Sequence, residues 1–288
     1  MKTDFKKVSI IGVGLIGGSF ALSLRKAGFD GTIYGTGRNQ DNLARANRVG
    51  IIDKFGSKPA EGVKDADLVL LASPVGQFPQ IAEDIKDHLK KGAIVTDVGS
   101  VKAEVINKLE PLMPEGVSFV GGHPIAGKEC SGADAASADL FNGARYIITP
   151  SPDTKQDALE KVTAVWKSFG SVIITMDPDE HDAIFAAVSH LPHVVAYVLI
   201  NTIIDLHKDQ NILHQGGKGL KDMTRIALSP PDLWRDICAY NKENMLKSLE
   251  LFSSSVSNVE NMIKRSDWDN LWKEFQKARN GRQILESD

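Results

Sequence analysis

A histidine followed directly by a proline stands in a run of small residues, "FVGGHPIAGKECSG", at positions 119–132. The imidazole of His123 titrates near neutrality, so it could accept the proton of an alcohol that is being oxidised. Pro124 restricts the backbone of His123, and the alanine and glycine that follow leave room for a ring. His123 is therefore a candidate general base, although a histidine that only stabilises its own loop fits the spacing equally well.

Three further segments carry polar side chains that could bind an anionic substrate. Ser100 follows the strand-like "GAIVTDVGS" and could orient a hydroxyl group, or it could cap a helix. Ser189 and His193 in "SHLPH" share one helical face, where two satisfied core polar groups are the rival interpretation. Lys221 and Arg225 are also four residues apart. Two cations on one face suit a dianionic substrate between them, or they form a solvated basic face.

A glycine pattern near the N-terminus predicts a dinucleotide site. Gly12, Gly14 and Gly17 form G-x-G-x-x-G between a β-branched segment and a helical one. The first glycine permits a tight turn, the second a close approach of the backbone to a pyrophosphate, and the third close packing of helix and strand. Leu15 and Ile16 lie inside the motif, where N–H groups at the start of the helix can bind phosphate.

The second expected strand, "GTIYGTG", ends differently from that of NAD-specific folds, which usually place Asp or Glu there for the ribose 2′-hydroxyl. Gly37 stands at that position and Arg38 follows. A guanidinium pairs with a 2′-phosphate, which an acid would repel. NADP is therefore favoured over NAD, with a merely solvated arginine as the alternative. Ser73, at the end of the third expected strand, is also expected to bind the cofactor.

The elements that would position these residues alternate between strand and helix through the first half of the chain. This alternation predicts a Rossmann-type, doubly wound parallel sheet with helices on both faces. After "MDPDEHD" the segments become long and helical, with a kink expected at Pro192. We expect a dinucleotide-binding domain over 1–177 and an all-helical dimerisation and substrate domain over 178–288. The segment 181–207 is apolar nearly all round, which predicts burial against a second subunit.

The composition argues against several classes of protein. The chain has 288 residues, a net charge of −3 and 25% charged residues of mixed sign, so no nucleic-acid partner is expected. Its apolar runs are short and interrupted and its N-terminus is charged, so neither a membrane span nor a signal peptide is expected. The two cysteines have no metal-type spacing. We expect a cytoplasmic homodimer with a small-molecule substrate and no metal.

Five segments together resemble the prephenate dehydrogenase family, which includes arogenate and cyclohexadienyl dehydrogenases of tyrosine biosynthesis. They are "IIGVGLIGGSFALSL", "DVGSVK", "GGHPIAGKECSG", "SHLPH" and "DMTRIALSPPDLWRDI", and the resemblance runs from about residue 7 to about residue 275. It implies that prephenate or arogenate transfers hydride to NADP or NAD, loses its ring carboxylate as CO2 and becomes aromatic. A hydroxyacid or pyrroline-carboxylate dehydrogenase with a helical dimer domain, or a dinucleotide sensor without turnover, is the alternative.

The resemblance also implies roles for individual residues. His123 would be the catalytic histidine that draws off the ring hydroxyl proton, with Ser100 assisting, and Arg225 would bind a substrate carboxylate. Trp234 would reach in from the partner subunit of a helix-swapped dimer. The remaining substrate contacts that the resemblance implies are Ser189, His193, Lys221 and Glu129.

Overall fold

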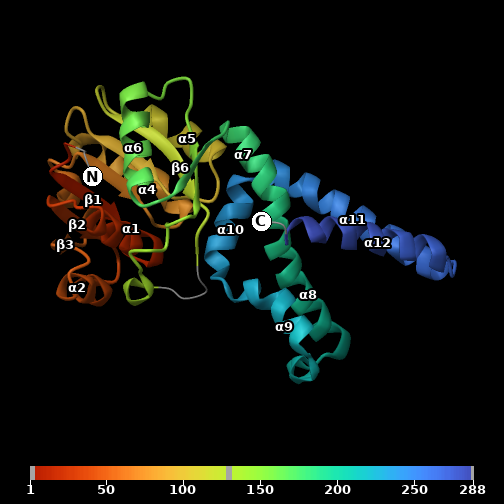
Figure 1. Cartoon of the computed structure of the whole chain (residues 1–288). Helices are drawn as coiled ribbons and strands as arrows, with labels where there is room; N and C mark the ends of the chain where they lie inside the picture. The colour runs from red at the N-terminus through yellow and green to blue at the C-terminus, as the bar shows by residue number, and fades with distance from the viewer. Residues whose placement is uncertain (1–3, 128–131, 287–288) are drawn as a thin grey trace. The chain divides into compact units, whose positions relative to one another are not determined.

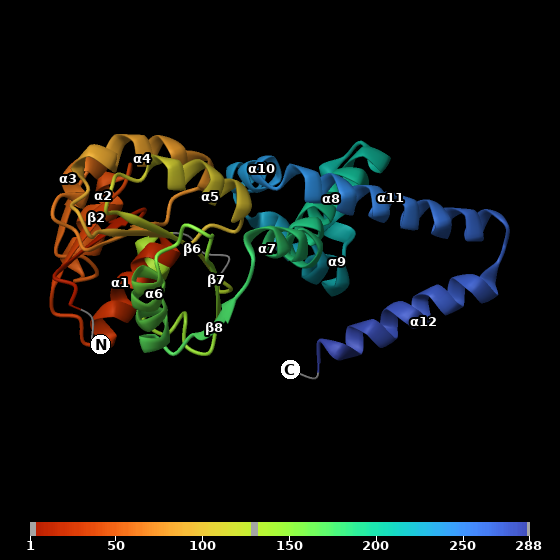
Figure 2. The same cartoon turned by 90° about the horizontal axis from the view of Figure 1, so that it is seen from above.

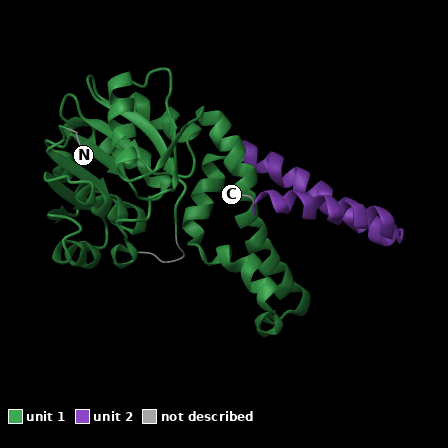
Figure 3. Ribbon diagram, in the orientation of Figure 1, with its two compact units in different colours: residues 1–242 green, residues 243–288 purple. Residues whose placement is uncertain are grey.

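The structure is a computed structural model that describes residues 4–127 and 132–286 (Figure 1). Its contacts divide the chain into two compact units, Met1–Lys242 and Glu243–Asp288 (Figure 3). The first unit therefore holds the sheet together with the first helices of the helical half. The domain boundary expected near residue 177 stays a prediction.

One eight-stranded sheet, with the order β3-β2-β1-β4-β5-β6-β7-β8, forms the centre of the first unit. Neighbouring strands are parallel except for β6 and β7, which are antiparallel. The Rossmann-type sheet is confirmed, but it is mostly rather than wholly parallel, and the short β3 was not predicted. The strands are β1 (Lys7–Ile11), β2 (Thr32–Thr36), β3 (Lys54–Gly56), β4 (Leu68–Leu71), β5 (Ile94–Asp97), β6 (Ser118–Pro124), β7 (Arg145–Thr149) and β8 (Val172–Thr175).

Helices cover both faces of this sheet (Figure 2). Side chains of α1, α2 and α6 pack with the strands into one buried apolar cluster. Those of α3, α4 and α5 pack into a second cluster, which α10 also joins. The doubly wound arrangement follows from strands that are apolar toward both faces. The helices are α1 (Leu15–Lys26), α2 (Gln40–Arg48), α3 (Pro59–Val63), α4 (Phe78–Ile85), α5 (Ala103–Leu109), α6 (Gln156–Ser168) and α10 (Pro231–Tyr240).

A long helical run follows the sheet. It consists of α7 (Pro178–Phe185), a π-helical turn (Ala186–His190) and α8 (Leu191–His207). The kink expected at Pro192 takes the form of this wider turn, because a proline cannot donate the hydrogen bond that an unbroken α-helix needs. The run continues past the proline, and α9 (Lys218–Thr224) follows it.

This helical run meets the length and hydropathy criteria of a membrane span, which the sequence analysis did not expect. Residues Pro178–His207 are long enough, with a mean hydropathy of 1.8 in their most apolar window, to span a membrane by length and composition. The core helix of a soluble protein passes the same test. Only 22% of that window is buried inside the chain, so a further surface is needed to cover it.

The second unit is a helical hairpin of α11 (Lys242–Lys264) and α12 (Trp268–Ile284). Its two arms diverge from their connection in Figure 2, where Ser266 takes the left-handed conformation with φ 54°. Large apolar side chains stay open along both arms: Leu251 is 71% exposed, Trp272 64% and Phe275 57%. Exposed apolar surface of this extent indicates an interaction face.

A pair of glycines in β6 explains how the strand before His123 packs. A methyl group on Gly122 would lie 1.8 Å from the Tyr146 hydroxyl, and one on Gly121 would lie 2.7 Å from Thr149 Oγ1. Tyr146 is fully buried and stacks on Trp166 with ring centroids 4.0 Å apart. The glycines therefore leave the space in which β7 side chains lie against the strand that ends at the histidine.

Gly122→Ala is expected to lower the free energy of unfolding by about 1–3 kcal/mol, because the added methyl forces the buried Tyr146 ring to move. Urea denaturation measures the change. Gly219→Ala is the control, since a methyl group there meets no atom within 4 Å. An equal effect of the two substitutions would contradict the packing argument.

Candidate active site

The glycine motif has the geometry that its spacing predicts. Gly12 has φ +105°, and a Cβ on it would lie 2.5 Å from the carbonyl of Ala72. A Cβ on Gly17 would lie 2.1 Å from the Gly12 carbonyl oxygen, whereas one on Gly14 meets nothing within 4 Å. Two of the glycines therefore permit tight packing, and Gly14 leaves open space for a ligand to approach the backbone.

A cavity of about 420 Å³ opens beside this motif. Two hydroxyls on its lining, Ser73 Oγ and Thr36 Oγ1, are buried and have no hydrogen-bond partner in the described part of the chain. Unpaired buried hydroxyls and the uncapped start of α1 suit a polar, phosphate-bearing ligand. Leu15 and Ile16 begin α1. The predicted cofactor residues that line the cavity are Gly12, Gly14, Gly37, Arg38 and Ser73.

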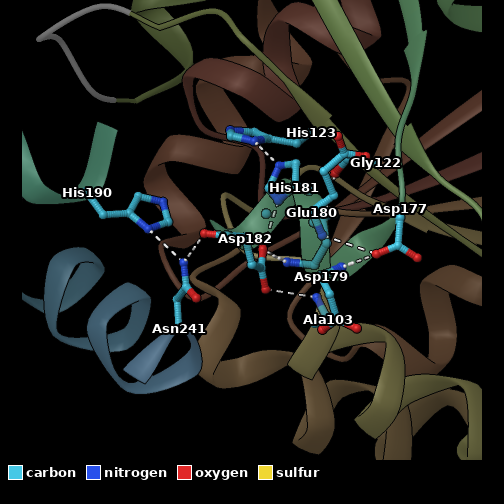
Figure 4. A network of polar contacts seen from close by, with 12 residues as sticks. Ala103, Gly122, His123, Asp177, Asp179, Glu180, His181, Asp182, His190 and Asn241 are labelled. Carbon is cyan, nitrogen blue, oxygen red and sulfur yellow. Dashed lines mark hydrogen bonds and ion pairs between the residues drawn. The ribbon is translucent and has the colours of Figure 1, made fainter. Parts of the chain in front are cut away.

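His123 is the last residue but one of β6 and the first member of a buried chain of hydrogen bonds (Figure 4). Its Nδ1 lies 2.9 Å from His181 Nε2, and His181 Nδ1 lies 2.8 Å from Asp182 Oδ1. The carboxylate can only accept, so His181 Nδ1 donates to it. His181 Nε2 then accepts from His123 Nδ1, which leaves Nε2 of His123 as the basic nitrogen.

Asp182 is itself fixed by backbone donors. The amides of Lys102 and Ala103 donate to its two carboxylate oxygens at 2.7 and 3.0 Å. Asn241 Nδ2 donates to the Asp182 carbonyl at 2.7 Å and lies 3.2 Å from His190 Nδ1. The start of α5, the start of α7 and the end of α10 therefore meet at the network in Figure 4.

A buried ion pair holds the backbone just before His123. The side chains of Lys102 and Asp97 form this pair, and both are fully buried. Lys102 Nζ also donates to the Gly122 carbonyl at 2.9 Å, and Asp97 Oδ1 accepts from the Gly122 amide at 3.1 Å. Both polar groups of one glycine are thus held by opposite charges. Removing one charge would leave the other buried and unpaired, at a cost of about 3–5 kcal/mol.

The burial of this network shifts its histidines in one direction. Burial holds the pKa of His123 well below its usual value, and the neighbouring imidazole of His181 and the charge of Lys102 act in the same direction. Burial lowers the pKa of His190 to about 4, against the charge of Asp182 and a backbone contact with Ser100. His123 is therefore neutral at physiological pH and can accept a proton.

The predicted substrate residues of the helical half fall into two groups. His193 donates from Nδ1 to the Ser189 carbonyl at 2.9 Å, and its ring stacks on Trp234 with centroids 3.7 Å apart. Trp234 is only 8% exposed within its own chain. Within one chain, His193 and the second apolar cluster cover the indole, and the expectation that Trp234 reaches into the partner's site stays a prediction.

Lys221 on α9 and Arg225, which follows that helix, are exposed. Figures 1 and 2 both show α9 away from the end of β6. The single chain therefore does not bring Arg225 together with His123, and a substrate bound by both residues stays a prediction. Glu129 lies outside the described residues.

The sequence analysis did not identify several members of the network. "MDPDEHD" marked only a change of pattern, although it contains both His181 and Asp182. A usable signal was present in the adjacent His181 and Asp182. A carboxylate beside a histidine can accept a hydrogen bond from that ring and fix its tautomer, and the ring can then orient a second imidazole. The members that were missed are Asp97, His181, Asp182 and Asn241, whereas Lys102 and His190 were noted but given no role.

A Rossmann-type sheet with this glycine motif and cavity, and a buried neutral histidine after a strand, defines a nicotinamide-dinucleotide dehydrogenase. Family models give the more specific identity. The model described as "Prephenate dehydrogenase, nucleotide-binding domain" matches residues 20–175, and "Prephenate dehydrogenase, dimerization domain" matches residues 177–277. The chain belongs to the prephenate dehydrogenase family.

Individual relatives agree with this assignment over nearly the whole chain. A prephenate dehydrogenase of Bacillus subtilis is 33% identical over 96% of this chain and 76% of its own. A cyclohexadienyl dehydrogenase of Zymomonas mobilis is 34% identical over 99% of this chain and 98% of its own. The structure of an Aquifex aeolicus prephenate dehydrogenase with hydroxyphenyl propionate and NAD+ is 39% identical, with a TM-score of 0.89, over 99% of this chain and all of that one.

Asp182→Asn is expected to lower kcat by at least about tenfold, because the amide can offer its NH2 to His181 and so disturb the tautomer that the chain of hydrogen bonds imposes. Steady-state kinetics measure the loss, and the dissociation constant of the cofactor should stay unchanged. Glu180→Gln, an exposed substitution on the same helix, is the matched control. A kcat equal to that of the wild type in Asp182→Asn would remove His181 and Asp182 from the site.

Proposed function

We propose that this chain catalyses the oxidative decarboxylation of prephenate or arogenate in tyrosine biosynthesis, with NADP preferred over NAD. The observation that carries the proposal is the buried hydrogen-bonded chain that ends in a neutral His123, in a protein of this family. The bound nicotinamide would take up the hydride. The protein's own residues orient the ring hydroxyl, accept its proton and bind the carboxylates.

His123 acts as the general base in this proposal. The hydrogen bonds that run from His123 through His181 to Asp182 leave Nε2 of His123 unprotonated. This nitrogen would accept the proton of the ring hydroxyl while hydride leaves the carbon that carries the hydroxyl. Ser100 lies in the loop between β5 and α5 and its backbone lies near His190, so its hydroxyl is proposed to orient the substrate. Loss of CO2 then makes the ring aromatic, which drives the reaction forward.

Wild-type enzyme is expected to turn over prephenate or arogenate, and His123→Asn to lower kcat by about 10²–10⁴-fold while cofactor binding survives. Arg225→Ala is expected mainly to raise the substrate KM. Steady-state kinetics with both substrates and both cofactors, against simple hydroxyacids, provide the measurement. No turnover of either cyclohexadienyl substrate by the wild type, or near-normal turnover by His123→Asn, would contradict the proposal.

The preference for NADP rests on the end of β2. Gly37 and Arg38 line the cavity, so no carboxylate follows the strand to bind a ribose 2′-hydroxyl or to repel a 2′-phosphate. A Cβ on Gly37 would meet only the Leu43 side chain, at 3.8 Å. The position can therefore accept a larger residue without disturbing the fold.

Gly37→Asp is expected to lower kcat/KM for NADP and to favour NAD, because the new carboxylate repels the 2′-phosphate and can bind the 2′-hydroxyl. The ratio of kcat/KM for the two cofactors measures the change, with Val49→Asp, an exposed position outside the cavity lining, as the control. An unchanged ratio in Gly37→Asp would separate this position from cofactor choice.

The helical half is proposed to form a homodimer, in a cytoplasmic enzyme without membrane or nucleic-acid partners. Its matched family model is a dimerisation domain, and the apolar window of α8 and the side chains along α11 and α12 are largely open in one chain. A second copy would cover them. It would also offer Lys221 and Arg225 of one subunit to the site of the other, since the single chain keeps them apart from His123.

Sedimentation at micromolar concentration is expected to give twice the mass of the 31.3 kDa chain. Trp272→Glu should weaken this association, because it places a charge on an apolar face that the partner would cover. Lys273→Glu, a neighbouring substitution on the polar side of α12, is the control. A monomeric wild type would contradict the dimer.

A further inference from the structure

Asn42 lines the cofactor cavity and also bonds to Ala133, which follows His123 by ten residues in the sequence. It belongs to the first turn of α2 and lines the cavity. Its backbone amide donates to the side chain of Asn39 at 2.9 Å, which fixes the start of the helix. The Asn42 side chain is thus held at the edge of the dinucleotide site, next to Gly37–Asn39, which also line the cavity.

Both ends of the Asn42 amide are used, and they bond to different parts of the protein. Nδ2 donates to the Val13 carbonyl at 2.7 Å, inside the glycine motif. Oδ1 accepts from the Ala133 amide at 3.1 Å. Because the Val13 carbonyl can only accept and the Ala133 amide can only donate, the Asn42 side chain must direct Nδ2 toward Val13 and Oδ1 toward Ala133. One half-buried residue therefore bridges the phosphate-binding loop and the chain that follows the His123 loop.

We call residues 132–139, which follow this loop in the sequence, the return segment. It lies along α1, the helix whose start faces the cofactor. Ser19 Oγ accepts from the Ser137 amide at 2.9 Å, and Ser23 Oγ donates to the Ala138 carbonyl at 3.1 Å. Gly132, at its start, has φ +92°. The return segment is thus anchored on α1 at one end and on Asn42 at the other.

We propose that Asn42 is a positioning residue that transmits occupancy of the dinucleotide site to the return segment, and so makes cofactor and substrate bind with positive coupling. The part that concerns the substrate rests on the proposed function. The physical basis is the shared bridge. A dinucleotide that fixes the glycine motif also fixes the Val13 carbonyl, the Asn42 amide and the Ala133 amide. The return segment is then already placed when the substrate arrives.

The coupling has a defined sign and is reciprocal. If the cofactor lowers the dissociation constant of the substrate by some factor, the substrate lowers that of the cofactor by the same factor. Couplings of this kind are about 5–150-fold. Removing the bridge should bring the factor toward one when the cofactor is raised to a concentration that saturates the variant, which is required because Asn42 also lines the cofactor cavity.

Hydrogen–deuterium exchange of the return segment tests the bridge without any substrate. In the wild type, saturating NAD+ or NADP+, in separate runs, is expected to slow exchange in peptides covering 132–139 by at least about fivefold. Asn42→Ala should abolish this slowing while peptides of the glycine motif stay protected. Asn42→Asp can still accept from Ala133 but cannot donate to Val13, so it should also lose the response.

The matched control is Asn47→Ala. Asn47 is half-buried on the same helix and its amide makes two hydrogen bonds, to the carbonyls of Ile52 and Asp53 at 3.0 and 2.8 Å, but it does not line the cavity. This variant should keep the full response. No slowing in the wild type, or slowing retained in Asn42→Asp or Asn42→Ala, would overturn the proposal.

Kinetics provide the second readout. In Asn42→Ala the KM for prephenate or arogenate is expected to rise at saturating cofactor by about the coupling factor, while kcat changes less. An unchanged KM beside a lost exchange response would overturn the coupling to substrate. A wild type that turns over neither compound would contradict the proposed function, yet the exchange result would still decide the role of Asn42.

Discussion

The structure of the site depends on one constraint, a pair of opposite charges that are both removed from water. Asp97 and Lys102 hold the amide and the carbonyl of Gly122, and the next residue is His123. Two desolvated charges are tolerated only when their remaining hydrogen-bonding capacity is used. Here that requirement is met by the backbone of Gly122, so the ion pair fixes the chain directly before His123.

The same segment of the chain also positions the other groups of the site. Lys102 and Ala103 also supply the backbone donors that hold the carboxylate of Asp182. Asp182 orients His181, and His181 orients His123. The segment after β5 thus fixes the imidazole of His123 from two directions, once through the peptide of Gly122 and once through the ring of His181. Neither route involves a flexible surface side chain, which favours the rigid and neutral imidazole that the proposed base requires.

Much of the fold could be predicted from local patterns. The glycine motif, the alternation of strand and helix, and the helical second half depend on neighbours in sequence. The antiparallel pairing of β7 with β6 could not be predicted from local patterns, because the sequence of a short apolar strand does not show which way it runs in the sheet. Nor could β3, which is three residues long.

The site was predictable only in part. His123 was visible because proline and glycine surround it. His181 and Asp182 were not, since their role depends on the distance from α7 to β6, across 58 residues of sequence. The role of Arg225 stays a prediction. Its spacing from Lys221 indicated a site for a dianionic substrate, and the geometry of a single subunit keeps it away from the imidazole.

The open hairpin of α11 and α12 has a consequence for how the enzyme is made. If the proposed dimer forms through this surface, a newly synthesised chain exposes Trp272, Phe275 and their neighbours until a second copy covers them. Maturation would then require two chains to meet, so its rate would be higher where many chains are translated close together. At low abundance the same surface would be open to chaperones and to aggregation.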